Sequence, residues 1–153
     1  MNESSIRVTA ESRRRGLLVI WGAQLLSVAL LFFLTYVVQP GSGAADNHTL
    51  AWTLGAIGFT TFIASFLVKR QLLAQAAAKR RADLGTTAYV LAFAMCELTA
   101  VLGFVAYIIT VLSYTLHSFI IAAAGLLLHF PVRGALEGID ANGAGANLNK
   151  TTI

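Results

Sequence analysis

Charged residues are scarce in this chain, and cysteine and proline are scarcer still. Only 12% of its 153 residues are charged, against about 25% in soluble domains, while 57% are hydrophobic. The single cysteine, Cys96, excludes an intramolecular disulfide and a cysteine-based metal cluster, and we expect it to pack as a small residue. The chain has no P-loop, nucleophile elbow or HExxH pattern. Nothing in it therefore points to an enzyme, a cofactor or a metal site.

Lysine and arginine are absent from long apolar stretches and gather between them. All eleven lie in residues 1–15, 69–83 and 132–153. The net charge of +4 could suggest nucleic-acid binding, but basic residues at the ends of apolar blocks are what membrane topology requires. We therefore exclude a nucleic-acid partner and expect a lipid bilayer instead.

Three apolar stretches set the number of expected spans. Residues 16–38 and 50–68 each approach or exceed the length of about 20 residues that crosses a hydrocarbon core. Residues 84–130 hold no lysine or arginine and are too long for one crossing, so a turn near residues 112–116 should divide them into spans 85–111 and 114–130. The expected fold is an all-α integral membrane bundle of four transmembrane helices.

The positive-inside rule orients these spans. We expect residues 1–15 to form a basic cytoplasmic segment, residues 16–131 the transmembrane domain, and residues 132–153 a flexible cytoplasmic tail. Both termini would then lie in the cytoplasm. The expected location of this multi-pass protein is the cell (inner) membrane. The basic loop 69–83 has a helix-favouring composition and should continue the second helix. Its five cations are expected to contact anionic lipid: Lys69, Arg70, Lys79, Arg80 and Arg81.

Glu97 is the main candidate for a functional residue. It is the only acidic residue between Leu84 and Phe130 and lies near the middle of the third span. An ionisable residue at this depth is costly if it stays charged and unpaired, so we expect it to be protonated, paired or bound to an ion. Thr99 and Gln24 are the candidates for hydrogen bonding to it, and we assign Glu97 with Thr99 to a proton- or ion-binding site.

Small residues recur at helical spacing in the second and third spans. In lipid, such residues let helices approach closely, so we interpret them as a packing seam that could also support self-assembly. The seam residues are Ala92, Cys96, Thr99 and Gly103 in the third span, with Gly55 and Gly58 in the second.

The stretch YVLAFAMCELTAVLGFVAYIIT resembles the second helix of the proteolipid c subunit of rotary ATP synthases. Phe93, Ala94 and Glu97 match the pattern F-A-x-x-E of that family, and the basic loop 69–81 has a counterpart there. The resemblance implies proton or sodium binding at Glu97. It covers about 20 of 153 residues, and the dense glycine repeat and the proline of the family's loop are missing here.

The ending LLLHFPVRG is similar to that of small uncharacterised four-span bacterial membrane proteins with a glutamate in the middle of a helix. This resemblance implies a fold but no activity.

Three functions remain open at this point. The first is a small integral membrane protein with a proton- or ion-responsive carboxylate at Glu97, self-assembling into a homo-oligomer. The second is a non-catalytic structural or accessory subunit of a larger membrane complex, in which Glu97 bonds to a helix of another membrane protein. The third is a small-solute transporter that acts as an oligomer.

Overall fold

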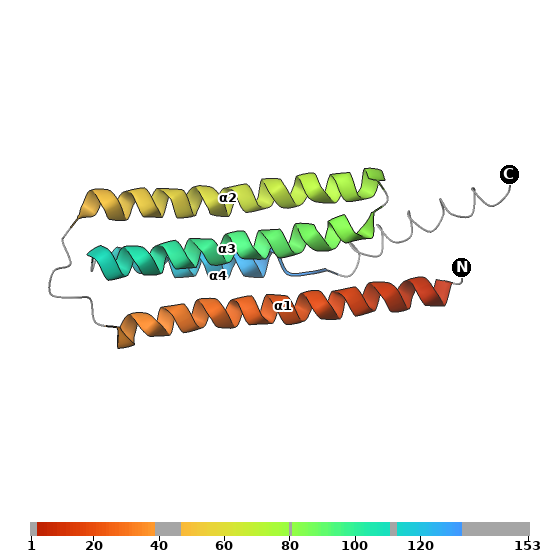
Figure 1. Ribbon diagram of the computed structural model, residues 1–153, viewed down its shortest axis with the longest axis horizontal. Coiled ribbons are helices and arrows are strands. Elements are labelled where there is room, and N and C mark those ends of the chain that lie inside the picture. Colours follow the sequence, from red (N-terminus) through yellow and green to blue (C-terminus); the bar gives the residue numbers. More distant parts are fainter. Residues whose placement is uncertain (1–2, 39–46, 80, 111–112, 133–153) are drawn as a thin grey trace.

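The computed structural model describes residues 3–38, 47–79, 81–110 and 113–132. This part of the chain forms α1 (Glu3–Val37), α2 (His48–Lys79), α3 (Ala82–Thr110), the short 3-10 helix η1 (Ser113–Leu116) and α4 (His117–Leu128). It contains no strand, so the expected all-α fold is confirmed (Figure 1). Most of the tail expected at 132–153, and the connection at 39–46, fall outside the described residues.

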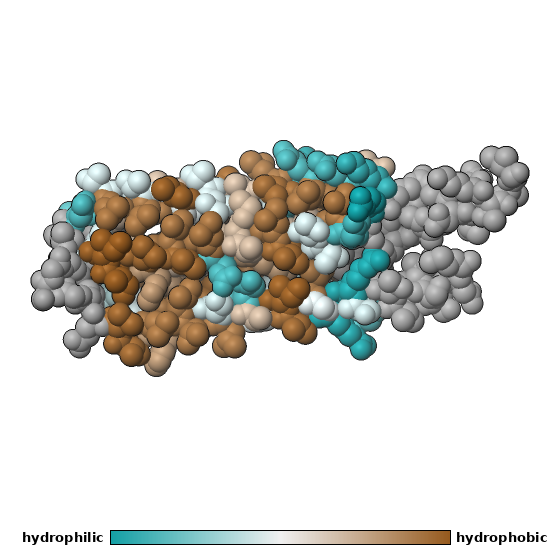
Figure 2. Space-filling model, in the orientation of Figure 1, coloured by the Kyte–Doolittle hydropathy of each residue, from teal (hydrophilic) through white to brown (hydrophobic). Residues whose placement is uncertain are grey.

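Three of the helices are long and apolar enough to cross a membrane. They are the part of α1 from Glu11 to Val37, α2 from His48 to Lys79, and α3 from Asp83 to Thr110, with 27, 32 and 28 residues. Each exceeds the roughly 20 residues of a single crossing. Hydrophobic residues cover most of the length of the visible face, and hydrophilic residues gather at the end where α2 passes into α3 (Figure 2). We call this the basic end and the other the non-basic end.

The fourth helix is shorter than expected. Residues 114–130 are expected to span as one helix, but α4 holds 12 residues and rises only about 18 Å. Two features limit it. The 3-10 helix η1 takes up the residues before His117, and Pro131 disfavours the α conformation at Phe130. Helix α4 therefore runs from the non-basic end only part of the way along α3 (Figure 1).

Helix α3 lies at the centre of the bundle. It contacts α1, α2 and α4, while α1 and α2 each pack against α3 and α4 (Figure 1). The indole of Trp21 ties α1 to α4, because its Nε1 donates to the carbonyl oxygen of Leu126 over 2.7 Å. Each of α1, α2 and α4 is thus held mainly by its contact with α3.

Local signals define the ends of α2. The side chain of Asn47 caps its start by accepting a hydrogen bond of 3.0 Å from the backbone nitrogen of Leu50. At the other end the helix continues to Lys79, through most of the segment that carries the basic loop. Next to it, the guanidinium of Arg81 binds both carboxylate oxygens of Asp83 at the start of α3.

Two glycines permit the closest helix contacts. A β-carbon at Gly125 would lie 2.7 Å from Cys96 Sγ and 2.9 Å from a ring carbon of Phe62, so only glycine fits where α4 crosses α3 and α2. A β-carbon at Gly103 would lie 2.4 Å from that of Ser118. These contacts pull α4 tightly onto α3.

Candidate functional site

Glu97 lies between α3 and α1 near the middle of both apolar segments. Its side chain is half-buried, and its Oε1 accepts a hydrogen bond of 2.5 Å from Ser27 Oγ on α1. Ser27 is close to the centre of the apolar block 16–38, which places the carboxyl at mid-depth of the hydrophobic region. The partner of Glu97 is thus a hydroxyl on the neighbouring helix, which the sequence analysis did not single out.

Gln24 completes a small polar group on α1. It precedes Ser27 by three residues, so the two side chains share one face of the helix. The carbonyl oxygen Oε1 of Gln24 is enclosed in the protein and has no hydrogen-bond donor in the described part of the chain. We name Gln24, Ser27 and Glu97 the polar patch. Figure 2 shows a hydrophilic spot over α1 and α3, about midway along a face that is otherwise hydrophobic.

Thr99 lies away from the polar patch. Its hydroxyl contacts the carbonyl oxygens of Gly58 on α2, over 3.0 Å, and of Met95 on its own helix, over 3.2 Å. Only two positions separate Thr99 from Glu97, yet two positions turn an α-helix by about 200°, so one faces α2 and the other α1. The expected pairing of Glu97 with Thr99 in one site is therefore not found, and Ser27 takes that place.

The residues of the expected seam are brought together inside one chain, with one exception. Ala92, Cys96, Thr99 and Gly103 of α3 are buried, as is Gly58 of α2. Gly55 is exposed, and a β-carbon added there would meet nothing within 4 Å. Cys96, Thr99 and Gly103 of this seam pack against α2 and α4.

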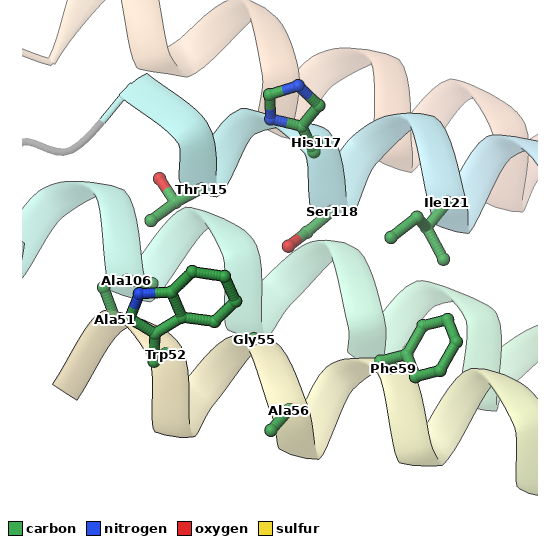
Figure 3. A pocket seen from close by; sticks show the side chains of 10 residues that line it. All are labelled: Ala51, Trp52, Gly55, Ala56, Phe59, Ala106, Thr115, His117, Ser118 and Ile121. Atoms are coloured by element: carbon green, nitrogen blue, oxygen red, sulfur yellow. The ribbon is translucent and has the colours of Figure 1, made fainter. Parts of the chain in front are cut away.

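Gly55 instead faces an open groove near the non-basic end (Figure 3). This groove of about 680 Å³ lies between α2 and α4, with Ala106 of α3 at its base. Trp52, Thr115, His117 and Ser118 contribute polar atoms to a lining that is otherwise apolar. The two helices converge deeper in the bundle, where Phe62 meets Gly125.

A second polar group, which the sequence analysis missed, lies toward the basic end. His129 caps the carboxyl end of α4 and is only 1% exposed. Its Nε2 lies 2.9 Å from Ser65 Oγ and its Nδ1 lies 3.4 Å from Lys69 Nζ. The Lys69 ammonium also sits 4.2 Å from the centre of the Tyr89 ring. We name His129, Ser65 and Lys69 the histidine cluster.

Hydrogen-bond accounting assigns the tautomer of His129. The one hydroxyl proton of Ser65 is directed to the carbonyl oxygen of Phe62 over 2.6 Å, so Ser65 Oγ must accept from His129. Nε2 therefore carries the proton and Nδ1 accepts from the Lys69 ammonium. His129 is thus a neutral, structural group that joins α4 to α2.

The five cations of the basic segment differ in their surroundings. Lys69 is half-buried in the histidine cluster, while Arg70 and Lys79 are exposed. Arg81 is exposed and paired with Asp83, and Arg80 lies outside the described residues. Within the described part of the chain, no group of three histidine, cysteine or acidic residues could hold a metal ion.

Comparison of the chain with protein-family models, with curated proteins and with solved structures gives no match.

Proposed function

We propose that this chain is a multi-pass protein of the cell membrane whose carboxyl at Glu97 takes up and releases a proton within the bilayer. The observation that carries the proposal is the hydrogen bond of 2.5 Å that the Ser27 hydroxyl donates to this carboxyl, with an enclosed acceptor that has no donor, Gln24 Oε1, three residues before Ser27 on α1.

The two protonation states of Glu97 each have a suitable neighbour in the polar patch. A carboxylate only accepts hydrogen bonds, and Ser27 Oγ donates to it. A protonated carboxyl also donates one hydrogen bond, and Gln24 Oε1 is an enclosed acceptor on the adjoining turn of α1. Because neither state leaves the site without partners, the group can change its protonation at a lower cost than an isolated carboxyl in lipid.

The proton fits this geometry better than a metal cation does. The oxygens of Ser27 and Glu97 are 2.5 Å apart, which is a direct hydrogen bond. Calcium and magnesium take six or more oxygen ligands, whereas the polar patch supplies one carboxyl, one hydroxyl and one amide oxygen. This favours a proton over a divalent cation as the species that Glu97 binds.

The membrane topology belongs to the same proposal. The basic end, where α1 starts and α2 passes into α3, faces the cytoplasm according to the positive-inside rule. The segment from η1 through α4 to Val132 makes a fourth crossing, in which η1 and residues 129–132 add to the length of α4. Both termini are then cytoplasmic, and the exposed cations Arg70 and Lys79 contact anionic lipid.

One observation favours a second function. The Ser27–Glu97 bond joins α1 to α3, and it could serve as a permanent fastening in an accessory subunit of a membrane complex. In that case Glu97 would keep its proton at every physiological pH.

Carbodiimide labelling separates the two functions, since a hydrophobic carbodiimide modifies protonated carboxyls in the membrane. In liposomes, we expect labelling at Glu97, located by mass spectrometry, to decline as the pH rises. Glu97→Gln should remove the label and keep the fold. Labelling that does not change with pH would contradict proton exchange and support the accessory role. Protection by sodium chloride, with potassium chloride as the control, would assign the site to a cation instead.

A further inference from the structure

The polar patch is not closed off from the surface of the bundle. Gln24 and Glu97 are both half-buried, and of the Gln24 amide only Oε1 is enclosed. The amide nitrogen makes no hydrogen bond within the described part of the chain, and Ser27 is the partner of Glu97 there. A donor and an acceptor therefore reach the side of the bundle at mid-depth.

Lipid cannot satisfy these groups. The hydrocarbon core offers no hydrogen-bond donor or acceptor, so polar atoms left facing it cost several kcal/mol. Intramembrane polar and ionisable side chains accordingly face other helices or a water-filled cavity. The polar patch needs a cover that carries polar groups of its own.

The surface around the patch allows another helix to come close. Ala23 precedes Ser27 by four residues and Ala94 precedes Glu97 by three, so each lies beside the patch on its own helix. Both alanines are exposed. Small exposed residues beside a polar group are typical of helix–helix interfaces in membranes. The seam of α3, by contrast, is buried within the chain and cannot serve a partner.

We propose that a second copy of this chain covers the polar patch, with the Gln24 amide of each copy donating to the Glu97 carboxyl of the other. A two-fold axis makes the same surface face itself, so residue i meets residue j and residue j meets residue i. The patch holds the donor and the acceptor within about one helical turn of each other, and it is therefore complementary to itself. A different membrane protein would have to supply a separate matched pair.

This inference rests on the membrane location proposed above but not on proton release by Glu97. A permanently protonated carboxyl still has an oxygen that accepts a hydrogen bond from the Gln24 amide. The carbodiimide experiment can therefore fail while the dimer stands, and the reverse also holds.

Site-directed cross-linking in liposomes tests the interface. Cys96 is replaced by serine, and single cysteines are introduced by Ala94→Cys beside the patch and by Ala56→Cys on the exposed side of α2. We expect a bismaleimide to give a covalent dimer with Ala94→Cys and much less with Ala56→Cys. Cross-linking with Ala56→Cys alone, or with neither variant, would overturn the proposal. The latter result would point to a different protein as the cover.

Energy transfer between labelled copies tests the hydrogen bonds. With protein diluted in lipid, Gln24→Leu should raise the dimer dissociation constant about tenfold, because two interhelical hydrogen bonds are lost. Gln24→Asn keeps the amide and should retain part of the affinity. Circular dichroism confirms that each variant is folded. An unchanged dissociation constant for a folded Gln24→Leu protein would refute the proposed contact.

Discussion

Ser65 and His129 are 64 positions apart in the chain, and a hydrogen bond of 2.9 Å joins them in the interior of the bundle. Neither side chain is more than 1% exposed. The bond fastens the carboxyl end of α4 to α2. Because buried polar groups are costly when they lose a partner, this pair should contribute measurably to the stability of α4.

A double-mutant cycle measures that contribution. Ser65→Ala leaves the Nε2 proton of His129 buried without an acceptor and should lower the free energy of unfolding by about 1–3 kcal/mol. When His129→Phe is already present, Ser65→Ala should cost about 1 kcal/mol less, since the buried Nε2 donor is no longer there to lose its acceptor. Reversible unfolding in mixed detergent micelles gives the four values. Strict additivity would show that the two residues do not interact.

Substitution of Gly125 should strain the crossing of α4 with α3. In Gly125→Ala the new methyl group would meet Cys96 Sγ and the ring of Phe62 at less than 3.0 Å, so the helices must move apart. We expect a loss of about 1–3 kcal/mol, as for other overpacked sites. The matched control is Gly55→Ala, whose methyl group meets nothing within 4 Å and should cost no stability. Thermal unfolding in detergent compares the two, and equal melting temperatures would contradict the close contact.

Lys69 should behave differently from its neighbours in the basic segment. Lys69→Gln removes the ammonium from the Tyr89 ring and from His129, so it should lower stability by about 0.5–2 kcal/mol in any lipid. Arg70→Gln and Lys79→Gln alter exposed cations and should leave that stability unchanged. They should instead weaken the binding of anionic lipid, by about 1 kcal/mol per cation. Unfolding in nanodiscs with and without anionic lipid separates the effects. A loss for Lys69→Gln only in anionic lipid would place this residue at the lipid surface.

Removal of the Ser27 hydroxyl should change the pH dependence of carbodiimide labelling at Glu97. In Ser27→Ala the carboxyl loses the hydroxyl that donates to it, so the free-energy difference between its two protonation states changes. Thr35→Ala is the control, because that hydroxyl bonds within α1 to the carbonyl oxygen of Phe32. If Ser27→Ala does not change the pH dependence of labelling, the Ser27 hydroxyl has no part in proton binding by Glu97.

Hydrophobic patterning alone indicated the all-α fold and the three long helices α1, α2 and α3. Long apolar blocks between basic segments allow few other structures in a bilayer. The length of α4 was harder to predict, since the polar residues within 114–118 do not show where the helix begins and only Pro131 signals its end. The 3-10 helix η1 has no signature in the hydrophobic pattern.

The candidate site could be predicted only in part. Glu97 is conspicuous because it is a single acidic residue in an apolar stretch. Gln24 was a candidate because it is the one glutamine in the uncharged block 16–38. Ser27 was not, because serine is common in membrane helices and nothing in the α1 sequence specifies which of its faces meets α3. The histidine cluster depends on contacts between residues far apart in the chain, and a single sequence contains no record of such contacts.

The manner in which α1 is attached has a consequence for how the protein could be assembled. Two hydrogen bonds, from Ser27 to Glu97 and from Trp21 to Leu126, join α1 to α3 and α4. Helices α2, α3 and α4 hold one another through the glycine contacts and the histidine cluster. Residues 47–153 should therefore insert and fold as a polypeptide of their own. A co-expressed fragment of residues 1–46 would then bind to it, so that two separate gene segments reconstitute the protein.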